Sequence, residues 1–329
     1  MSEYHQKVPE SFLLFGVSGR VGDAAARAVS KQAPKAKLRL ASTKPEKAEK
    51  LKKKWPNAEV VVANYEDLPS LDAAFKDIEA IFIITQFGLD EKLAMTNVVT
   101  AAKRSANKLL VMIRFTAIFP EFSLNRLPKS LQGSEHGPAF ISQPIGKAIM
   151  DESLLPVIYL NAGATFIENY KDHAKPIREA GKMIWPSRRV PFILVEDIGE
   201  IIANIILSGD VRHFGAFHTM NNGQDRLDLF EAAEIISQVI GKKIEVVASK
   251  EAYFKVYTSF MGEAMANRLW EFFQYEKDHE VIWALNDFAE RTLGRKPKTL
   301  KAWVEENKEL FVSGNSQVEG GLVANLKRS

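Results

Sequence analysis

The segment Phe12-Leu-Leu-Phe-Gly-Val-Ser-Gly-Arg-Val-Gly22 decides how this chain folds. Four apolar residues lead into three glycines, and an alanine-rich stretch at 24–29 follows, which predicts a strand, a tight turn and a helix. Gly16 lets the chain leave the strand sharply, Gly19 removes a side chain where a phosphate approaches, and Gly22 allows close helix packing. The pattern therefore predicts a dinucleotide-binding turn, with a pyrophosphate at the helix N-terminus.

Beyond this turn, short apolar runs alternate with stretches whose apolar residues recur at helical spacing. This order predicts an α/β fold, a Rossmann-type doubly wound parallel sheet. Such sheets bind ligands beyond the carboxyl ends of their strands, so functional residues are expected there. The runs that predict strands are residues 12–15, 37–41, 59–62, 80–84, 109–113 and 157–160.

The regular alternation ends near residue 160, which predicts a dinucleotide-binding domain over residues 1–160. Later segments near 190–220 return to this domain as a helix and a strand. Residues 161–312 are expected to form mainly a substrate cap, which is smaller than the first domain and mostly helical. Its aromatic residues either fill a core or line a pocket for a hydrophobic substrate. The tail at 313–329 is rich in Gly, Ser and Asn and predicts a flexible segment.

The composition is that of an ordinary globular protein, with 46% hydrophobic and 26% charged residues and a net charge of +3. Acids and bases are interspersed, which gives no footprint for nucleic acid. Cysteine is absent, which excludes thiol catalysis and disulfides, and the six histidines show no metal-ligand spacing. No apolar run resembles a signal peptide or a membrane span, so we expect a cytoplasmic protein with no membrane partner, as a monomer or a homodimer.

Several further motifs resemble the NmrA-like group of atypical short-chain dehydrogenase/reductases over most of the chain. This group includes quinone, azo-dye and alkaloid reductases, relatives of isoflavone reductase, and non-catalytic redox sensors. The resemblance implies a Rossmann domain with a small cap that binds NADP(H). Besides the glycine turn, it is carried by Leu38-Arg-Leu-Ala-Ser-Thr-Lys-Pro-Glu-Lys47, Asn64-Tyr-Glu-Asp-Leu-Pro-Ser-Leu71, Leu154-Leu-Pro-Val-Ile-Tyr159, Phe166-Ile-Glu-Asn169 and Val195-Glu-Asp-Ile-Gly199.

The residues after the second predicted strand favour NADP(H) over NAD(H). Enzymes that select NAD usually have an acid there, which would repel the 2′-phosphate, but this chain has Ala41-Ser42-Thr43-Lys44. The family commonly places an arginine near Thr43. Either Lys44 replaces it as a point charge, or Lys44 is a surface residue and affinity for the cofactor is low.

The remaining cofactor contacts are assigned by position in the same way. The candidates around the pyrophosphate are Gly16, Ser18, Gly19, Arg20, Val21 and Gly22. Thr43 and Lys44 are expected at the adenosine phosphate, and Asn64 near the adenine. Gln86 and Phe87, which follow the fourth predicted strand, are expected to border the nicotinamide.

The proton donor of the ordinary short-chain dehydrogenases has no counterpart here. Those enzymes use a tyrosine with a lysine four residues later, and none of the seven tyrosines has that neighbour. Some relatives keep one lysine at the position of Gln143. The amide of glutamine can orient a carbonyl or a hydroxyl group, but it cannot act as a general acid or base. Lys147 lies one turn further along and faces either the cleft or the solvent.

Other residues that transfer protons are found in two segments. Glu168 and Tyr170 follow the sixth predicted strand, together with Lys171, Asp172 and His173. Glu168 and Asn169 resemble a family motif that often closes the active site. A glutamate near an apolar pocket has a raised pKa and can donate a proton. His136 lies in Gly133-Ser-Glu-His-Gly137, which is either a mobile lid or ordinary loop.

Three classes of function are compatible with these residues. The first is an NADP(H)-dependent reductase of a hydrophobic small molecule in specialised metabolism, because hydride transfer to an electron-poor acceptor does not require a strong protein acid. The second is a redox-neutral isomerase or cyclase, for example one that rearranges an epoxide. The third is a non-catalytic NADP(H) sensor. Of these, the residues favour the reductase, narrowly ahead of the redox-neutral enzyme.

Overall fold

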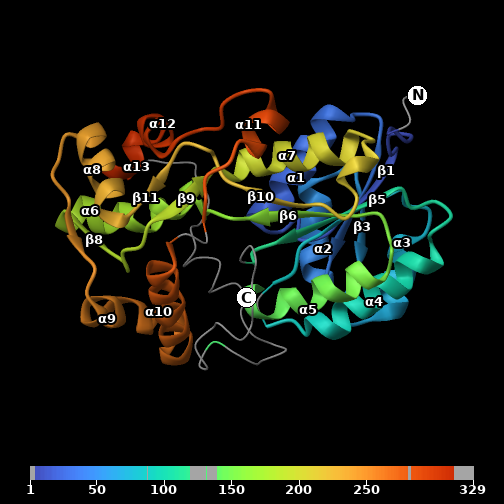
Figure 1. Ribbon diagram of the computed structural model, residues 1–329, viewed down its shortest axis with the longest axis horizontal. Helices are drawn as coiled ribbons and strands as arrows, with labels where there is room; N and C mark the ends of the chain where they lie inside the picture. Colours follow the sequence, from blue (N-terminus) through green and yellow to red (C-terminus); the bar gives the residue numbers. More distant parts are fainter. Residues whose placement is uncertain (1–3, 87, 119–130, 132–138, 281–282, 315–329) are drawn as a thin grey trace.

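The computed structural model describes residues 4–86, 88–118, 131, 139–280 and 283–314. Within them, seven parallel strands form one sheet in the order β10-β6-β5-β4-β1-β2-β3. This is the predicted Rossmann-type doubly wound sheet, which the structure confirms (Figure 1). The strands are β1 (Ser11–Leu14), β2 (Lys37–Ser42), β3 (Glu59–Val62), β4 (Ala80–Ile83), β5 (Val111–Thr116), β6 (Val157–Ala162) and β10 (Phe217–Met220).

Helices cover both faces of this sheet (Figure 1). On one face α1 (Arg20–Gln32) lies beside α7 (Val195–Leu207), and on the other α4 (Glu91–Arg104) packs between α3 (Leu68–Phe75) and α5 (Ala139–Glu152). The short helix α2 (Pro45–Lys54) packs against β2 and β3. Both faces are therefore buried, which explains why the strands read as continuous apolar runs rather than as alternating ones.

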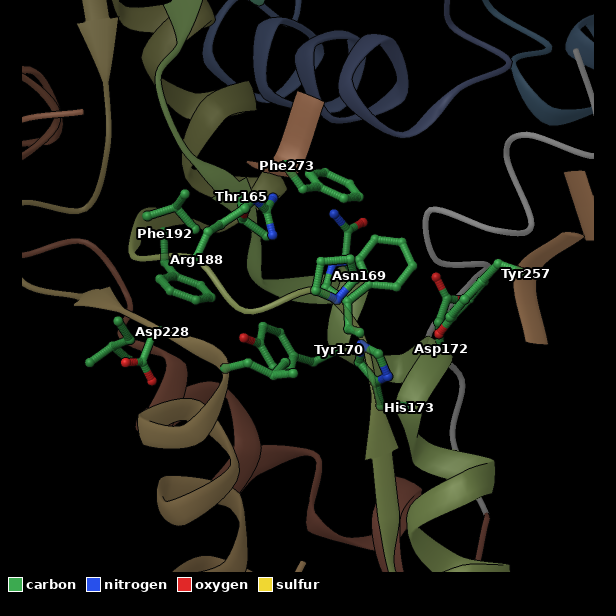
Figure 2. A pocket seen from close by; sticks show the side chains of 15 residues that line it. Thr165, Asn169, Tyr170, Asp172, His173, Arg188, Phe192, Asp228, Tyr257 and Phe273 are labelled. Carbon is green, nitrogen blue, oxygen red and sulfur yellow. The ribbon is translucent and has the colours of Figure 1, made fainter. Parts of the chain in front are cut away.

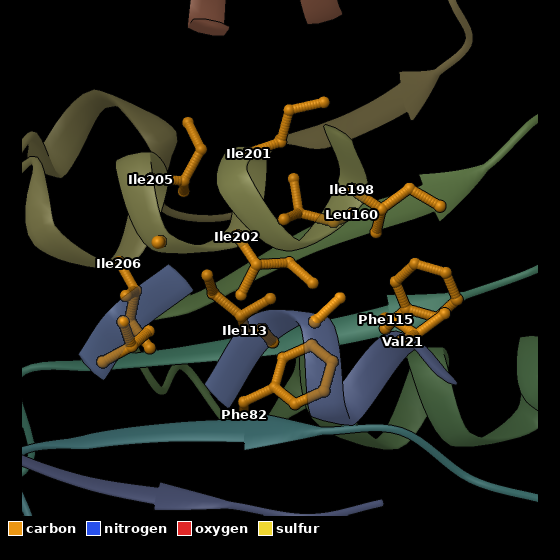
Figure 3. Close-up of a cluster of buried hydrophobic side chains, with 14 of the residues drawn as sticks. Val21, Phe82, Ile113, Phe115, Leu160, Ile198, Ile201, Ile202, Ile205 and Ile206 are labelled. Carbon is orange, nitrogen blue, oxygen red and sulfur yellow. The ribbon is translucent and has the colours of Figure 1, made fainter. Parts of the chain in front are cut away.

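The core between α1, α7 and the sheet is rich in isoleucine. Figure 3 shows Ile198, Ile202 and Ile206 of α7 over the strands, where they meet Phe82 and Ile113. The two helices can approach closely because Gly199 has no side chain: a Cβ there would lie only 2.6 Å from the backbone of Ala24. The first helix is thus fixed on the sheet, and with it the position of the glycine turn.

Two strands extend further than their apolar runs predict. β5 was expected at 109–113 but begins at Val111 and continues through Arg114 to Thr116, and β6 continues through Asn161. All three polar residues are fully buried. The Nη2 of Arg114 donates to Glu91 and Thr85, and the hydroxyl of Thr116 donates to Asn161, so the sheet accommodates these polar side chains and β5 continues past its apolar run.

The second half of the chain adds a smaller layer beside the sheet (Figure 1). Its strands form a three-stranded sheet, β11-β9-β7, and a two-stranded sheet, β12-β8. The strands are β7 (Thr165–Phe166), β8 (Lys182–Ile184), β9 (Val190–Ile193), β11 (Arg226–Leu227) and β12 (Glu245–Val247). The expected cap therefore contains small sheets as well as helices.

The helices of this half alternate along the chain with the short strands or come after them. They are the 3-10 helices η3 (Ile167–His173) and η4 (Val211–His213), and α6 (Ala174–Ala180), α8 (Leu229–Ile240), α9 (Lys250–Met261), α10 (Glu263–Asp278), α11 (Phe288–Leu293), α12 (Leu300–Glu306) and α13 (Lys308–Val312). The helix α11 packs on α7 and β10. The division at residue 160 into two domains stays a prediction.

Three expectations fall on residues outside the described ranges. They are the nicotinamide contact of Phe87, the lid around His136, and most of the tail beyond residue 314. In the described part of the chain, no helix combines the length and the apolar character that crossing a bilayer requires.

Candidate functional site

The glycine turn has the geometry that its sequence predicts. Gly16 has φ +70°, and a Cβ there would lie 2.4 Å from the Cγ2 of Ile84. A Cβ on Gly22 would lie 2.3 Å from the carbonyl oxygen of Gly16, so α1 begins in direct contact with the turn. Both positions therefore require glycine, one for its conformation and both for space.

The N-terminus of α1 is open to a ligand. No side chain in the described residues caps it, and its N-cap residue Gly19 is exposed together with Ser18. A Cβ on Gly19 would meet only the oxygen of Gly16, at 3.3 Å. Unpaired N–H groups and the helix dipole at such an end favour a phosphate group. The turn therefore fits the pyrophosphate of a dinucleotide.

Arg20 links the turn to the cap. Its Nη2 donates a hydrogen bond of 2.9 Å to the Oδ1 of Asn169, and its guanidinium lies 5.4 Å from the centre of the Phe166 ring. Burial lowers the pKa of Arg20, and the nearby carboxylates of Glu168 and Asp172 oppose this shift. The first residue of α1 thus contacts the segment that follows β6.

The candidates for the adenosine end lie at the carboxyl ends of β2 and β3. Thr43 and Lys44 are exposed there, and the hydroxyl of Ser42 donates to the carbonyl of Lys44 at 3.0 Å. Asn64 accepts a hydrogen bond of 3.1 Å from the N–H of Glu66, which shapes the loop after β3. The side chains of Thr43 and Lys44 thus face solvent beside the open edge of the sheet.

A buried polar network lies at the ends of β4 and β5. The Nη2 of Arg114 donates to Glu91 at 2.8 Å and to the hydroxyl of Thr85 at 2.8 Å. The amide of Gln143 accepts from the N–H of Ala117 at 2.8 Å and donates to Thr85 at 3.3 Å. Gln143 therefore fastens α5 to both strand ends, and Thr85 places the exposed Gln86 beside them.

A pocket lies on the cap side of the turn (Figure 2). It is lined by the aromatic side chains Tyr170, His173, Trp185, Phe192, Tyr257 and Phe273 and by the polar residues Thr165, Asn169, Asp172, Arg188 and Asp228. Because Asn169 both lines the pocket and accepts from Arg20, the pocket and the glycine turn share one wall.

Residues 16–137, which include the glycine turn, match a family model whose description is NAD(P)H-binding. These residues form an NAD(P)H-binding domain. The match includes the glycine turn, the ends of β2 to β5 and the segment before α5. It confirms the predicted nicotinamide dinucleotide as the cofactor, since the turn of this domain also has the required geometry. No curated protein matches the sequence at a significant level.

Solved structures with this domain share the fold of the whole chain. The NADPH-dependent quinone oxidoreductase from Escherichia coli in complex with NADPH is 18% identical, with a TM-score of 0.72, covering 90% of this chain and 99% of that one. The Citrobacter triphenylmethane reductase with NADP(H) is 17% identical, with the same TM-score and coverage. NmrA, a negative transcriptional regulator solved with NADP, is 16% identical with a TM-score of 0.72, covering 94% and 98%. The chain therefore has the fold that its resemblance to the NmrA-like group implies.

The two candidates on α5 are engaged within the protein. Gln143 is 3% exposed and both ends of its amide are hydrogen-bonded, as described above. Lys147 pairs with Asp151 at 2.6 Å, and its Nζ lies 4.5 Å from the centre of the Tyr159 ring. The structure thus brings Gln143 to the strand ends of the NAD(P)H-binding domain but directs Lys147 toward β6.

Of the candidates after β6, Tyr170, Asp172 and His173 line the pocket, whereas Glu168 does not. Glu168 is buried, its Oε1 accepts from the N–H of Val195 at 2.8 Å, and its Oε2 has no hydrogen-bond partner in the described residues. Burial raises the pKa of Glu168 and that of Tyr170. Burial also lowers the pKa of His173 to about 4, so its imidazole is neutral at pH 7. Burial therefore keeps Tyr170 and His173 uncharged at pH 7 and shifts the pKa of Glu168 in the direction that favours its uncharged form.

The sequence did not single out Arg188, Trp185 or Tyr257 as pocket residues. They come from the β8–β9 connection and from α9, far from the glycine turn in sequence. The one signal was the aromatic richness of the C-terminal half, from which Phe273 reaches the pocket. In the described residues, no group of three or more His, Asp and Glu side chains could hold a metal ion.

Proposed function

We propose that this protein is an NADP(H)-dependent reductase of a flat, hydrophobic small molecule, with a role in specialised metabolism. The observation that carries the proposal is the hydrogen bond from Arg20 to Asn169, at 2.9 Å. It joins the residue that opens α1 to a residue that lines an aromatic pocket. A dinucleotide on the turn and a substrate in the pocket would therefore be neighbours, as hydride transfer requires.

The cofactor would be held mainly by backbone groups. Gly16, Ser18, Gly19, Val21 and Gly22 surround the pyrophosphate in this proposal, and Arg20 adds a positive charge. Asn64 would lie near the adenine, with Gln86 and Phe87 near the nicotinamide. When bound, NADPH supplies a hydride.

The preference for NADP(H) rests on charge at the end of β2. Thr43 and Lys44 are exposed there, and no acidic side chain occupies the four positions 41–44. A lysine attracts the 2′-phosphate as a point charge, without the two-pronged geometry of an arginine. We therefore expect NADPH to bind more tightly than NADH, by a smaller factor than an arginine would give.

Proton transfer to the product is assigned to the pocket rather than to α5. The amide of Gln143 cannot act as a general acid and Lys147 is paired with Asp151, so their role is to hold the strand ends and the helix in place. Tyr170 lines the pocket, and its raised pKa keeps the phenol protonated. Glu168, which is buried in the same 3-10 helix, and His136, in the segment before α5, are the other proposed proton donors.

The test is a titration of the purified protein with NADPH and with NADH, followed by the fluorescence of the reduced nicotinamide. Tight binding with NADPH preferred supports the proposal, and a Lys44→Glu variant should lose at least tenfold in NADPH affinity while its NADH affinity changes little. Lys47→Glu, one turn further along α2, is the matched control and should change neither. Oxidation of NADPH in the presence of aromatic carbonyl acceptors then measures turnover.

A sensor is the second candidate, because both α5 side chains that could act in catalysis are engaged within the protein. NmrA, a transcriptional regulator solved with NADP, has the same fold. Tight NADPH binding with no turnover of any acceptor would favour the sensor. Failure of both nucleotides to bind would instead favour the redox-neutral isomerase or cyclase.

A further inference from the structure

We propose that the pocket recognises flat aromatic molecules through an uncharged acceptor oxygen, such as a ketone carbonyl, and that Arg188 and Tyr170 bind this oxygen. The proposal deepens the reductase function, on which it rests, by naming the class of substrate. It assigns binding roles only.

Arg188 is held so that only part of its guanidinium is engaged. Its Nε pairs with Glu276, and the guanidinium carbon lies 4.2 Å from the centre of the Phe273 ring. Neither Nη1 nor Nη2 has a hydrogen-bond partner in the described residues, although the side chain is 12% exposed and lines the pocket. Both nitrogens are accessible from the pocket, where they can donate hydrogen bonds to a ligand acceptor.

Tyr170 provides a second donor to the same space. Its ring packs against Phe192 and His173, with centroid distances of 5.7 and 5.8 Å, and no hydrogen bond from its hydroxyl is formed with a described residue. Figure 2 shows Arg188 and Phe273 on one side of the pocket and Tyr170 and His173 on the other. The charge of Arg188 also acts on the phenol, opposing the effect of burial on its pKa. Two donors that line one pocket favour a ligand that accepts hydrogen bonds.

The charges around the pocket disfavour an anionic ligand. Glu276 already balances the charge of Arg188, and it also accepts from the Nε1 of Trp283 at 3.0 Å. Asp172 and Asp228 line the same pocket, Asp228 with Arg189 as its ion-pair partner, while His173 stays neutral at pH 7 and adds no positive charge. A ligand carboxylate would add a further negative charge beside these groups, so a neutral carbonyl is the better match.

The walls of the pocket favour a flat ring system. Trp185 lies at the centre of an aromatic group, 4.7 Å from Tyr257 at an interplanar angle of 81° and 5.2 Å from Phe273. Such walls offer both ring faces and ring edges to a planar ligand.

The test uses three ligands of one shape, measured by equilibrium dialysis against the full chain without nucleotide. They are 2-acetylnaphthalene, 2-ethylnaphthalene, which lacks the oxygen, and 2-naphthoate, which replaces the ketone with a carboxylate. We expect the ketone to bind about tenfold more tightly than the hydrocarbon, which is the value of one hydrogen bond from a charged donor. The naphthoate should bind more weakly than the ketone.

Variants then assign the preference to residues. The double variant Arg188→Met/Glu276→Gln removes both charges without leaving a buried carboxylate unpaired, and it should reduce the ketone-to-hydrocarbon ratio to near one. Tyr170→Phe should reduce it severalfold. Arg212→Gln is the control, because Arg212 pairs with Asp210 and neither residue lines the pocket, and it should retain the ratio.

Several results would overturn the proposal: equal binding of ketone and hydrocarbon, tightest binding of the naphthoate, no binding of any ligand, or a ratio that survives in the double variant. Circular dichroism confirms that each variant is folded. Because these measurements contain no nucleotide, failure of the reductase proposal in the NADPH titration is distinguishable from failure here.

Discussion

His173 shows how burial alone sets the state of a functional group. Its ring lies 5.8 Å from that of Tyr170 and 6.0 Å from that of Trp185, and burial lowers its pKa to about 4. The unfolded chain binds this proton near pH 6.5, whereas the folded protein binds it only near pH 4. The stability that the neutral ring contributes is therefore present above pH 6.5 and is lost as the pH falls toward 4.

The first prediction follows from this shift. When the pH falls from 7.5 to 4.5, the free energy of unfolding should decrease in the wild-type protein by about 2–3 kcal/mol more than in His173→Phe, because phenylalanine takes up no proton. Urea unfolding at the two pH values measures the difference. His218, whose pKa burial also lowers to about 4, contributes equally to both proteins and cancels in the comparison. The same pH dependence in variant and wild type would show that His173 is not the group that titrates.

At the scale of elements, the sequence predicted most strands but not where some of them end. Apolar runs identify buried parallel strands well, and β3 has the predicted bounds. They fail at the ends of β5 and β6, because Arg114, Thr116 and Asn161 are buried with partners that come from distant segments. A polar residue at the end of an apolar run is taken as the start of a loop, unless the buried group to which it forms a hydrogen bond is known. The same partners are what hold the candidate site together.

Gln143 provides the second prediction. Gln143→Leu keeps the size of the side chain but removes the acceptor of the Ala117 N–H and the donor to Thr85, two hydrogen bonds that contribute about 0.5–1.5 kcal/mol each. Urea unfolding at pH 7.5 measures this loss. Gln86→Leu is the control, because Gln86 is exposed, and it should change stability by less than about 0.5 kcal/mol. If both variants were equally stable, Gln143 would not fasten α5 to the strand ends.

The two close contacts of α1 give the third prediction. Gly22→Ala and Gly199→Ala each force a Cβ against backbone, at 2.3 Å from Gly16 and 2.6 Å from Ala24, and each should destabilise the protein by about 1–3 kcal/mol. Only Gly22→Ala distorts the turn itself. NADPH affinity should therefore fall at least tenfold in Gly22→Ala and by less than threefold in Gly199→Ala. Equal losses of affinity would mean that stability, rather than the turn, controls binding.

At the scale of the whole molecule, the pocket could not be predicted from the sequence. Its walls come from the segment after β6, the β8–β9 connection, the start of α8, and α9 and α10. Glu168 and Tyr170 were singled out because chemically active residues cluster there in sequence. Arg188 was not, because its role depends on Glu276 and Phe273, nearly ninety positions away. The glycine turn was predicted in detail because all of its constraints are local.

The last prediction concerns the link between the two sites. Since Arg20 faces the turn and also donates to Asn169, a dinucleotide that engages Arg20 should order the wall of the pocket. Saturating NADPH should then raise the affinity for 2-acetylnaphthalene roughly fivefold, and by thermodynamic reciprocity the ketone should raise NADPH affinity by the same factor. Equilibrium dialysis with and without NADPH measures this coupling.

Asn169→Leu removes the acceptor and should bring the coupling factor close to one, even if both ligands still bind. Asn204→Leu is the matched control: Asn204 accepts from Gln32 at 2.8 Å and so ties the opposite end of α1 to α7. It should leave the coupling intact. If Asn169→Leu kept the full factor, the two sites would communicate by another route, and adjacency alone would have to explain how a substrate meets its cofactor. If the factor fell only in Asn169→Leu, one hydrogen bond between the first helix and the cap would account for the coupling.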